Sequence, residues 1–199
     1  MAVGSGRIGP NAILQLVTVL ETEIGTAQTA RMLALSGIAA RPDPAMGLID
    51  EAPVARLHQR LRQDLPDAAA RLARAAGART GDYILAHRIP RPAQWGLRHL
   101  PASLSARLLS GAIARHAWTF CGSGEFRVLH TAPPVFAIVD NPVVRGERSG
   151  RPLCHWHAAV FETLFQALCG PGWRAVETQC CAQGAASCQF ALLRDIGRG

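Results

Sequence analysis

Most of the cysteines gather in the last quarter of the sequence, where their spacing suits metal coordination. Five of the six cysteines follow residue 150. A helix start and a hairpin are expected to bring four side chains together: Cys154, Glu177, Cys180 and Cys188. Zinc takes four tetrahedral ligands from thiolate, imidazole and carboxylate groups, and four protein ligands make a closed, structural site. The set therefore predicts a structural zinc, with a cluster of buried thiols without metal as the alternative.

Two choices within this set stay open. In a regular strand, Glu177 and Cys181 point to the same face and Cys180 points to the other. A zinc ligand at Cys180 therefore requires a bulge or a bend in the strand. His155 and His157 follow directly after the first expected ligand and are chemically acceptable substitutes. A helix start or a surface position is the more common place for such histidines.

A second group of side chains suits a flat apolar ligand. His116 and Phe120 are one turn apart in an expected helix, so they share a face. With Trp118, Trp156 and Phe165 they would line an apolar pocket. There His116 would offer a hydrogen bond or an axial contact to a chelated metal. Ordinary core packing is the alternative for these aromatic side chains.

These side chains require a fold that brings helices onto a small sheet. Amphipathic spacing and helix-ending residues predict helices over 11–24, 29–39, 54–65, 67–77 and 104–118. Strand-like runs, a helix that opens at Pro152 and a hairpin are expected at 126–129, 135–139, 152–168 and 173–193. The prediction is an α+β protein with a helical N-terminal region (1–80) and a ligand-binding domain (81–199). In that domain, helices pack on a mostly antiparallel sheet whose C-terminal hairpin is held by zinc.

Composition and charge exclude several classes of protein. The chain has 199 residues, of which 49% are hydrophobic and 18% charged, so a packed core is expected rather than disorder. All 21 cationic Lys+Arg positions are arginine and form no basic run, and only 6% of residues are aromatic. Nucleic acid is therefore not an expected partner. No apolar run reaches the roughly 18 residues that cross a bilayer, and no export signal stands out, so a cytoplasmic location is expected.

Several catalytic motifs are missing from the sequence. Cys121-Gly-Ser-Gly124 lacks the glycine pattern of a nucleophile elbow, so serine hydrolysis is not expected. Neither Gly-x-Gly-x-x-Gly nor a phosphate-binding loop ending in Gly-Lys-Ser/Thr occurs. A dinucleotide or nucleotide site therefore has no support from the sequence motifs.

Three stretches resemble the bacteriochlorophyll 4-vinyl reductase family of purple photosynthetic bacteria. They are residues 115–126, Asn141-Pro142, and residues 154–162 together with Glu177-x-x-Cys180 and Cys188-x-Phe190. Roughly residues 81–196 are similar to the small-molecule-binding vinyl-4-reductase domain, and residues 46–51 and 83–90 resemble the photosynthetic branch. In aromatic-sensing relatives of this domain, zinc is held by cysteine, glutamate, cysteine and cysteine. The resemblance places that ligand set on positions 154, 177, 180 and 188.

The resemblance implies a role at the reduction of the 8-vinyl group of divinyl protochlorophyllide or chlorophyllide. The family's name implies a reductase, which would need NADPH or another electron donor. The other interpretation is a non-catalytic carrier or ligand-sensing module that binds the magnesium tetrapyrrole and serves a separate reductase. The missing dinucleotide, flavin and iron–sulfur motifs favour binding.

The same resemblance sets the expected partners. The magnesium tetrapyrrole comes first, and Arg88 or Arg91 would meet its propionate. Other bacteriochlorophyll biosynthesis enzymes and a second copy in a homodimer are further expected partners. A place at the edge of the photosynthetic membrane stays open beside the cytoplasmic one.

Overall fold

The computed structural model describes residues 6–44 and 47–195. Met46 and residues 196–199, at the edges of two predicted stretches, lie outside the described residues. The helices are α1 (Asn11–Ile24), α2 (Thr26–Leu35), α3 (Glu51–Asp64), α4 (Ala69–His87), α5 (Arg91–His99), α6 (Ala102–Arg115) and α7 (His155–Cys169). The strands are β1 (Arg7–Ile8), β2 (Ile49–Asp50), β3 (Glu125–Thr131), β4 (Pro134–Val139), β5 (Trp173–Gln179) and β6 (Ser187–Arg194). Short 3-10 turns are η1 (Ala117–Thr119), η2 (Pro142–Val144) and η3 (Cys181–Gln183).

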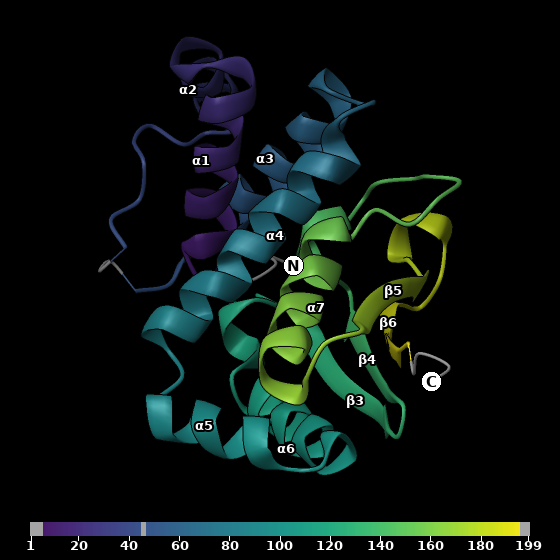
Figure 1. The fold of residues 1–199 in the computed structure, drawn as a ribbon. Coiled ribbons are helices and arrows are strands. Elements are labelled where there is room, and N and C mark those ends of the chain that lie inside the picture. The colour runs from purple at the N-terminus through teal and green to yellow at the C-terminus, as the bar shows by residue number, and fades with distance from the viewer. Residues whose placement is uncertain (1–5, 45–46, 196–199) are drawn as a thin grey trace.

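A four-stranded antiparallel sheet and the helix α7 form the centre of the molecule. The strand order is β3-β4-β6-β5, with β1 and β2 forming a separate short pair. Helix α7 lies over one face of the sheet, α4 runs beside α7, and α1, α2 and α3 lie beyond α4 (Figure 1). Helices α5 and α6 lie together at the opposite end, along the lower edge of Figure 1. The predicted α+β class with a mostly antiparallel sheet is confirmed.

The main core lies between α7 and the sheet. Phe136 of β4 and Phe190 of β6 alternate inward along their strands and meet Phe161 of α7 at ring-centroid distances of 5.1 and 5.4 Å. Phe165, one turn further along α7, packs 6.0 Å from Phe136. All four rings are almost completely buried. Ring edges meet ring faces here, an arrangement that adds to the free energy gained by burial.

Helix α4 differs from its prediction. Gly77 does not end the helix, and that prediction is wrong, because the helix continues to His87. A Cβ atom at Gly81 would lie 2.7 Å from Thr163 of α7, and one at Gly77 would overlap the Trp156 carbonyl. These glycines therefore let two helices approach closely. The division expected after residue 80 falls inside α4.

The chain before α7 and the chain after α4 also differ from the prediction. Pro152 does not lie in the first turn of α7, which begins at His155 with Cys154 as its N-cap residue. The stretch predicted as a connector contains α5, which begins one residue after Pro90. Within the described residues, no helix combines the length and apolar character needed to cross a membrane.

Candidate metal centre

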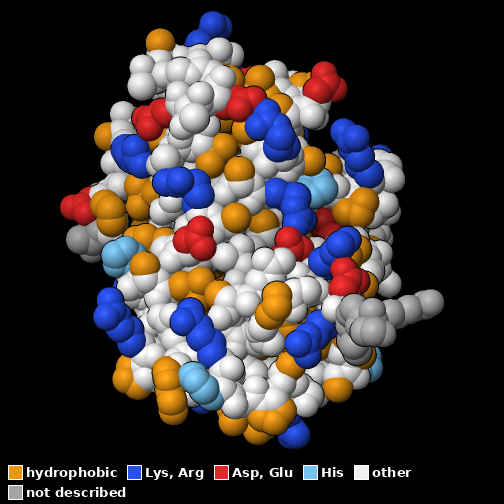
Figure 2. All heavy atoms as spheres, in the orientation of Figure 1, with side chains coloured by type: hydrophobic (Ala, Val, Ile, Leu, Met, Phe, Trp, Pro, Cys, Tyr) orange, Lys and Arg blue, Asp and Glu red, His pale blue; other side chains and the backbone are white. Residues whose placement is uncertain are grey.

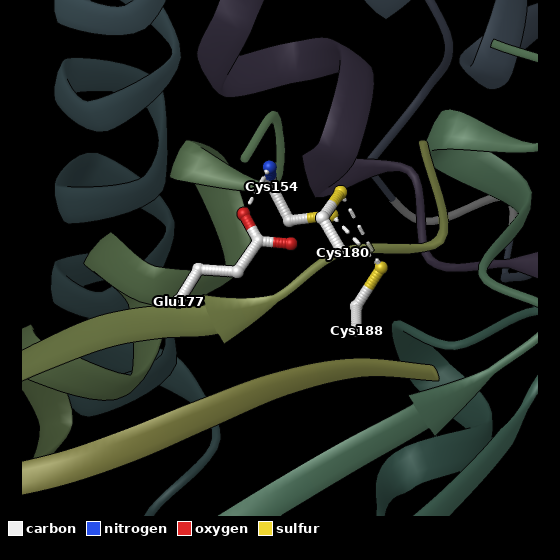
Figure 3. A group of neighbouring side chains, drawn as sticks. All are labelled: Cys154, Glu177, Cys180 and Cys188. Carbon is white, nitrogen blue, oxygen red and sulfur yellow. Dashed lines mark hydrogen bonds between the residues drawn. The ribbon is translucent and has the colours of Figure 1, made fainter. Parts of the chain in front are cut away.

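Four side chains with metal-binding atoms converge where α7 begins beside the C-terminal hairpin. Cys154 is the N-cap of α7, Glu177 lies on β5, Cys180 follows β5 directly, and Cys188 lies on β6. One ligand atom from each residue lies within 4.8 Å of all the others. The structure therefore brings together all four residues of the predicted set (Figure 3).

A bulge in β5 is what brings Cys180 into this group. The pairing of β5 with β6 shifts between Glu177 and Gln179, so the chain gains one residue relative to its partner strand. The extra residue turns Cys180 to the same side as Glu177, as the prediction for a ligand at this position required. Cys188 lies on the core-facing side of β6, together with Phe190.

The spacing of the donor atoms suits a tetrahedral metal. The Cys154 and Cys188 sulfurs are 3.3 Å apart, and the Cys188 and Cys180 sulfurs are 3.9 Å apart. Zinc–sulfur bonds of about 2.3 Å at tetrahedral angles place two sulfurs about 3.8 Å apart. All three cysteines are at most 1% exposed. A zinc ion therefore fits between them with only small shifts of the side chains.

The glutamate supplies an oxygen that lacks a partner in the protein. The Cys154 amide donates a hydrogen bond of 2.7 Å to Oε2 of Glu177. The other carboxylate oxygen, Oε1, is buried and has no hydrogen-bond partner. In Figure 3 this oxygen lies on the side of the cysteine sulfurs. A buried oxygen without a partner costs free energy, and a metal bound among the four donors would satisfy it.

Burial and mutual contact change the acidity of these groups. Burial, followed by the nearby Cys180, raises the pKa of Glu177 to about 8. Burial also raises the pKa of Cys154 well above its usual value. Hydrogen bonds donated by the neighbouring thiols lower the pKa of Cys180. Several negative donors held this close together favour a cation among them.

The neighbouring residues that sequence left as alternatives lie outside the donor group. Cys181 contributes its backbone amide, which donates to the Cys188 sulfur at 3.3 Å, while its side chain does not join the four. His157 is buried, and its Nε2 lies 3.3 Å from the Phe120 carbonyl oxygen. Asn141 donates to the Cys154 sulfur at 3.4 Å. Such hydrogen bonds to the sulfurs orient the metal ligands and stabilise thiolate charge.

The five residues predicted for a flat ligand occupy different environments. The helical face expected for His116 and Phe120 is wrong, because α6 ends at Arg115 and a 3-10 turn follows. His116 and Trp118 are exposed, and Trp118 keeps 55% of its surface in solvent. Trp156 and Phe165 are core residues, and half-buried Phe120 packs edge-on against Phe161. Their role in ligand binding stays a prediction.

A polar cavity beside the metal centre was missed from the sequence. It measures about 260 Å³ and lies between α3, α4 and the loop before α7. Its lining includes Arg62, Glu147, Arg148, Arg151 and His155. Burial, followed by nearby arginines that include Arg62 and Arg151, lowers the pKa of His155, so the cavity has a positive potential. The arginines at 145, 148 and 151, shortly before Cys154, were the signal available in the sequence.

Comparison with known proteins places this hairpin and fold in a defined class. The vinyl-4-reductase domain family matches residues 134–194, a span that contains β4, α7, β5, β6 and all four donor residues. H-NOX proteins from K. algicida and S. oneidensis share the fold, with TM-scores of 0.62 and 0.58 at 11% identity. These matches cover 96% and 94% of this chain and 99% of each solved chain. The class is thus a vinyl-4-reductase-domain protein with an H-NOX-like fold.

Two curated relatives identify the family. The "Bacteriochlorophyll synthase 23 kDa chain" of Cereibacter sphaeroides is 56% identical over 94% of this chain and 90% of its own length. The protein of the same name from Rhodobacter capsulatus is 47% identical over 94% of this chain and 86% of its own length. The chain therefore belongs to the family of these 23 kDa chains, the bacteriochlorophyll 4-vinyl reductase family that its motifs resemble.

Proposed function

We propose that this protein acts in bacteriochlorophyll biosynthesis, at the reduction of the 8-vinyl group of divinyl protochlorophyllide or chlorophyllide, by binding the magnesium tetrapyrrole. The observation that carries the proposal is 56% identity, over 94% of the chain, to a protein named as a bacteriochlorophyll synthase chain. Identity at this level over nearly the full length supports a shared pathway. The finer assignment, to one reaction and to pigment binding, rests on the resemblance of the motifs.

A structural zinc held by Cys154, Glu177, Cys180 and Cys188 is part of this proposal. Three buried sulfurs and one buried carboxylate oxygen without a partner support it. Zinc there would join the start of α7 to β5 and β6, and four protein ligands would leave no open position for a substrate. The four donors would therefore stabilise the vinyl-4-reductase domain instead of acting on the pigment.

His116 is the residue proposed for axial contact with the pigment magnesium. Its Nδ1 lies 2.9 Å from the carbonyl oxygen of Ala112, so Nδ1 must be the donor of that hydrogen bond. The neutral ring then keeps its lone pair on Nε2, which is the arrangement seen in metal-binding histidines. The ring is exposed, with exposed Trp118 two residues further on. These two residues are therefore the part of the predicted ligand set that a pigment can reach from solvent.

Anaerobic incubation of the pure protein with divinyl protochlorophyllide, with and without NADPH, tests the proposal. Absorption spectra report pigment binding, and mass spectrometry reports loss of the 8-vinyl group. Conversion with NADPH alone would establish a reductase, whereas tight binding without conversion supports a carrier for a separate reductase. A protein that neither binds nor converts the pigment would contradict the proposal.

A matched pair of histidine variants tests the proposed contact. His116→Ala is expected to weaken pigment affinity and to shift the absorption bands of the bound pigment, because the axial ligand is lost. His130→Ala removes another exposed histidine, on β3, and is expected to bind as the parent does. Equal affinity and equal spectra in the two variants would exclude His116 as the axial ligand.

A further inference from the structure

Helices α5 and α6 expose large apolar side chains at one end of the molecule. No residue of α5 is buried, and Trp95 on this helix keeps 65% of its surface exposed. Leu100, Leu104 and Leu108 follow along the turn and the first half of α6, with exposures of 36 to 49%. Together with Arg91, Arg98 and Arg107 these four residues define the α5–α6 surface. Large exposed apolar groups at one end of a protein mark a contact site.

The charges on and around this surface are all positive. Residues 83–124 include five arginines and three histidines and contain no aspartate or glutamate. Among the described residues, none of the ion pairs involves Arg91, Arg98 or Arg107. Orange hydrophobic atoms lie beside blue arginine and pale-blue histidine atoms along the lower edge of Figure 2, with no red there.

We infer that the α5–α6 surface docks on an anionic lipid bilayer. A helix that lies in a membrane interface buries an apolar face containing Trp and Leu and places Arg against acidic headgroups. The long arginine side chains can extend to those headgroups while their methylene groups stay in contact with apolar surface. Trp95 suits the same interface, because its ring is apolar and its N–H is polar.

The charge pattern also favours lipid over a second copy of this chain. A symmetric dimer through this surface would place arginines against arginines, and opposed like charges cost free energy. An anionic bilayer offers both negative headgroups and an apolar interior to one flat surface. The inference concerns peripheral docking, and it does not depend on the identity of the pigment.

Sedimentation with lipid vesicles tests the inference on the full chain. The parent protein is expected to bind vesicles of phosphatidylglycerol and phosphatidylcholine much more tightly than vesicles of phosphatidylcholine alone. Binding to the anionic vesicles is expected to weaken as salt is added, since salt screens the arginines from the headgroups. Equal binding to both vesicle types, or binding to neither, would overturn the inference.

Two sets of triple variants assign the binding to this surface. Replacing Arg91, Arg98 and Arg107 with glutamine is expected to lower partitioning onto anionic vesicles about 100-fold. A control with the same change in charge replaces three exposed arginines elsewhere: Arg31, Arg148 and Arg194. The control is expected to keep most of the binding. An equal loss in both sets would show attraction by net charge alone and would overturn the assignment.

An apolar variant set separates lipid docking from a protein interface. Trp95→Ser, Leu104→Ser and Leu108→Ser combined are expected to lower vesicle binding by at least about tenfold, through the loss of buried apolar area. Leu35→Ser, at the end of α2, is the control for an exposed leucine elsewhere. Light scattering reports the oligomeric state. A parent dimer that the triple variant dissociates, with vesicle binding unchanged, would assign the surface to self-association and overturn the inference.

Discussion

A Cβ atom at Gly77 of α4 would overlap the backbone carbonyl oxygen of Trp156 in α7. The same atom would lie 2.8 Å from the Ala159 Cβ, so the two helices meet here without room for a methyl group. This contact joins a helix of the N-terminal half to the helix that begins at the donor cluster. The close approach of α4 and α7 therefore links the helical region to the vinyl-4-reductase domain.

Substitution of Gly77 is expected to destabilise the protein, although alanine is the better helix former. Gly77→Ala should lower the free energy of unfolding by about 1–3 kcal/mol, because α7 must move away. Gly111→Ala, within α6, meets nothing within 4 Å and should raise stability by up to about 1 kcal/mol. Urea denaturation of both variants measures the effect. Stabilisation by both substitutions would contradict the packing role of Gly77.

A buried glutamate forms a second link between the two halves of the chain. Glu51, at the start of α3, is 5% exposed and accepts hydrogen bonds of 2.6 Å from both the backbone and the hydroxyl of Ser123. Arg145 pairs with it at 3.0 Å. Glu51→Gln should lower the free energy of unfolding by about 2–3 kcal/mol, because a buried Arg145 contact loses its charge partner.

An exposed ion pair is the control for Glu51. Glu125 pairs with Arg127 at 2.6 Å on the surface of β3, where water screens the interaction. Glu125→Gln should therefore leave the urea midpoint unchanged. If both glutamine variants shift the midpoint equally, burial does not account for the role of Glu51.

The buried histidine of α3 makes stability depend on pH. Burial, followed by the charge of Arg62, lowers the pKa of His58 to about 3, and its Nε2 lies 3.2 Å from the Ala12 carbonyl oxygen. The unfolded chain, with a histidine pKa of about 6.5, then binds an extra proton between pH 6.5 and 3. Folding stability therefore falls as the pH decreases through this range, by about 2 kcal/mol at pH 5 from this residue.

Removal of the titrating group isolates that contribution. His58→Gln should lose about 2 kcal/mol less stability than the parent between roughly pH 7.5 and 5. Other acid-sensitive groups cancel in this comparison, because both proteins contain them. His130→Gln, on the exposed face of β3, should follow the parent. Identical pH dependence of the parent and His58→Gln would show that His58 does not titrate as a buried group.

Much of the fold could be predicted because hydrophobic spacing determines which faces are buried. The helix over Asn11–Ile24, the strands β3 and β4, and the C-terminal hairpin follow directly from apolar periodicity and turn residues. The continuation of α4 beyond Gly77 could not be predicted. Glycine reads locally as a helix end, whereas here the neighbouring helix requires the missing side chain.

The donor cluster could be predicted because its ligand types and spacing are specific, but its register needed the structure. Whether Cys180 or Cys181 faces the other donors depends on the bulge after Glu177, and single-strand periodicity cannot locate a bulge. The pocket around His116 depended on a continuous helix, whereas the chain turns into a 3-10 segment at Ala117. The cavity lined by Arg62 requires contacts between distant segments, which no local pattern shows.

Loss of one sulfur donor should weaken the whole vinyl-4-reductase domain and not merely its surface. Cys188→Ala removes a completely buried donor between Cys154 and Cys180. Without it, zinc would no longer join α7 to the hairpin, and the melting temperature should fall. Differential scanning calorimetry of the parent with and without a zinc chelator should show a similar decrease. Equal melting temperatures for the parent and Cys188→Ala would contradict a structural metal.

The metal content of the purified protein tests the central claim most directly. Inductively coupled plasma mass spectrometry of the parent, Cys180→Ala and Cys181→Ala compares adjacent cysteines, of which only Cys180 belongs to the donor group. The account predicts one zinc ion per chain in the parent and in Cys181→Ala, and a large loss in Cys180→Ala. A parent protein without zinc, or loss of zinc from Cys181→Ala with retention in Cys180→Ala, would contradict it.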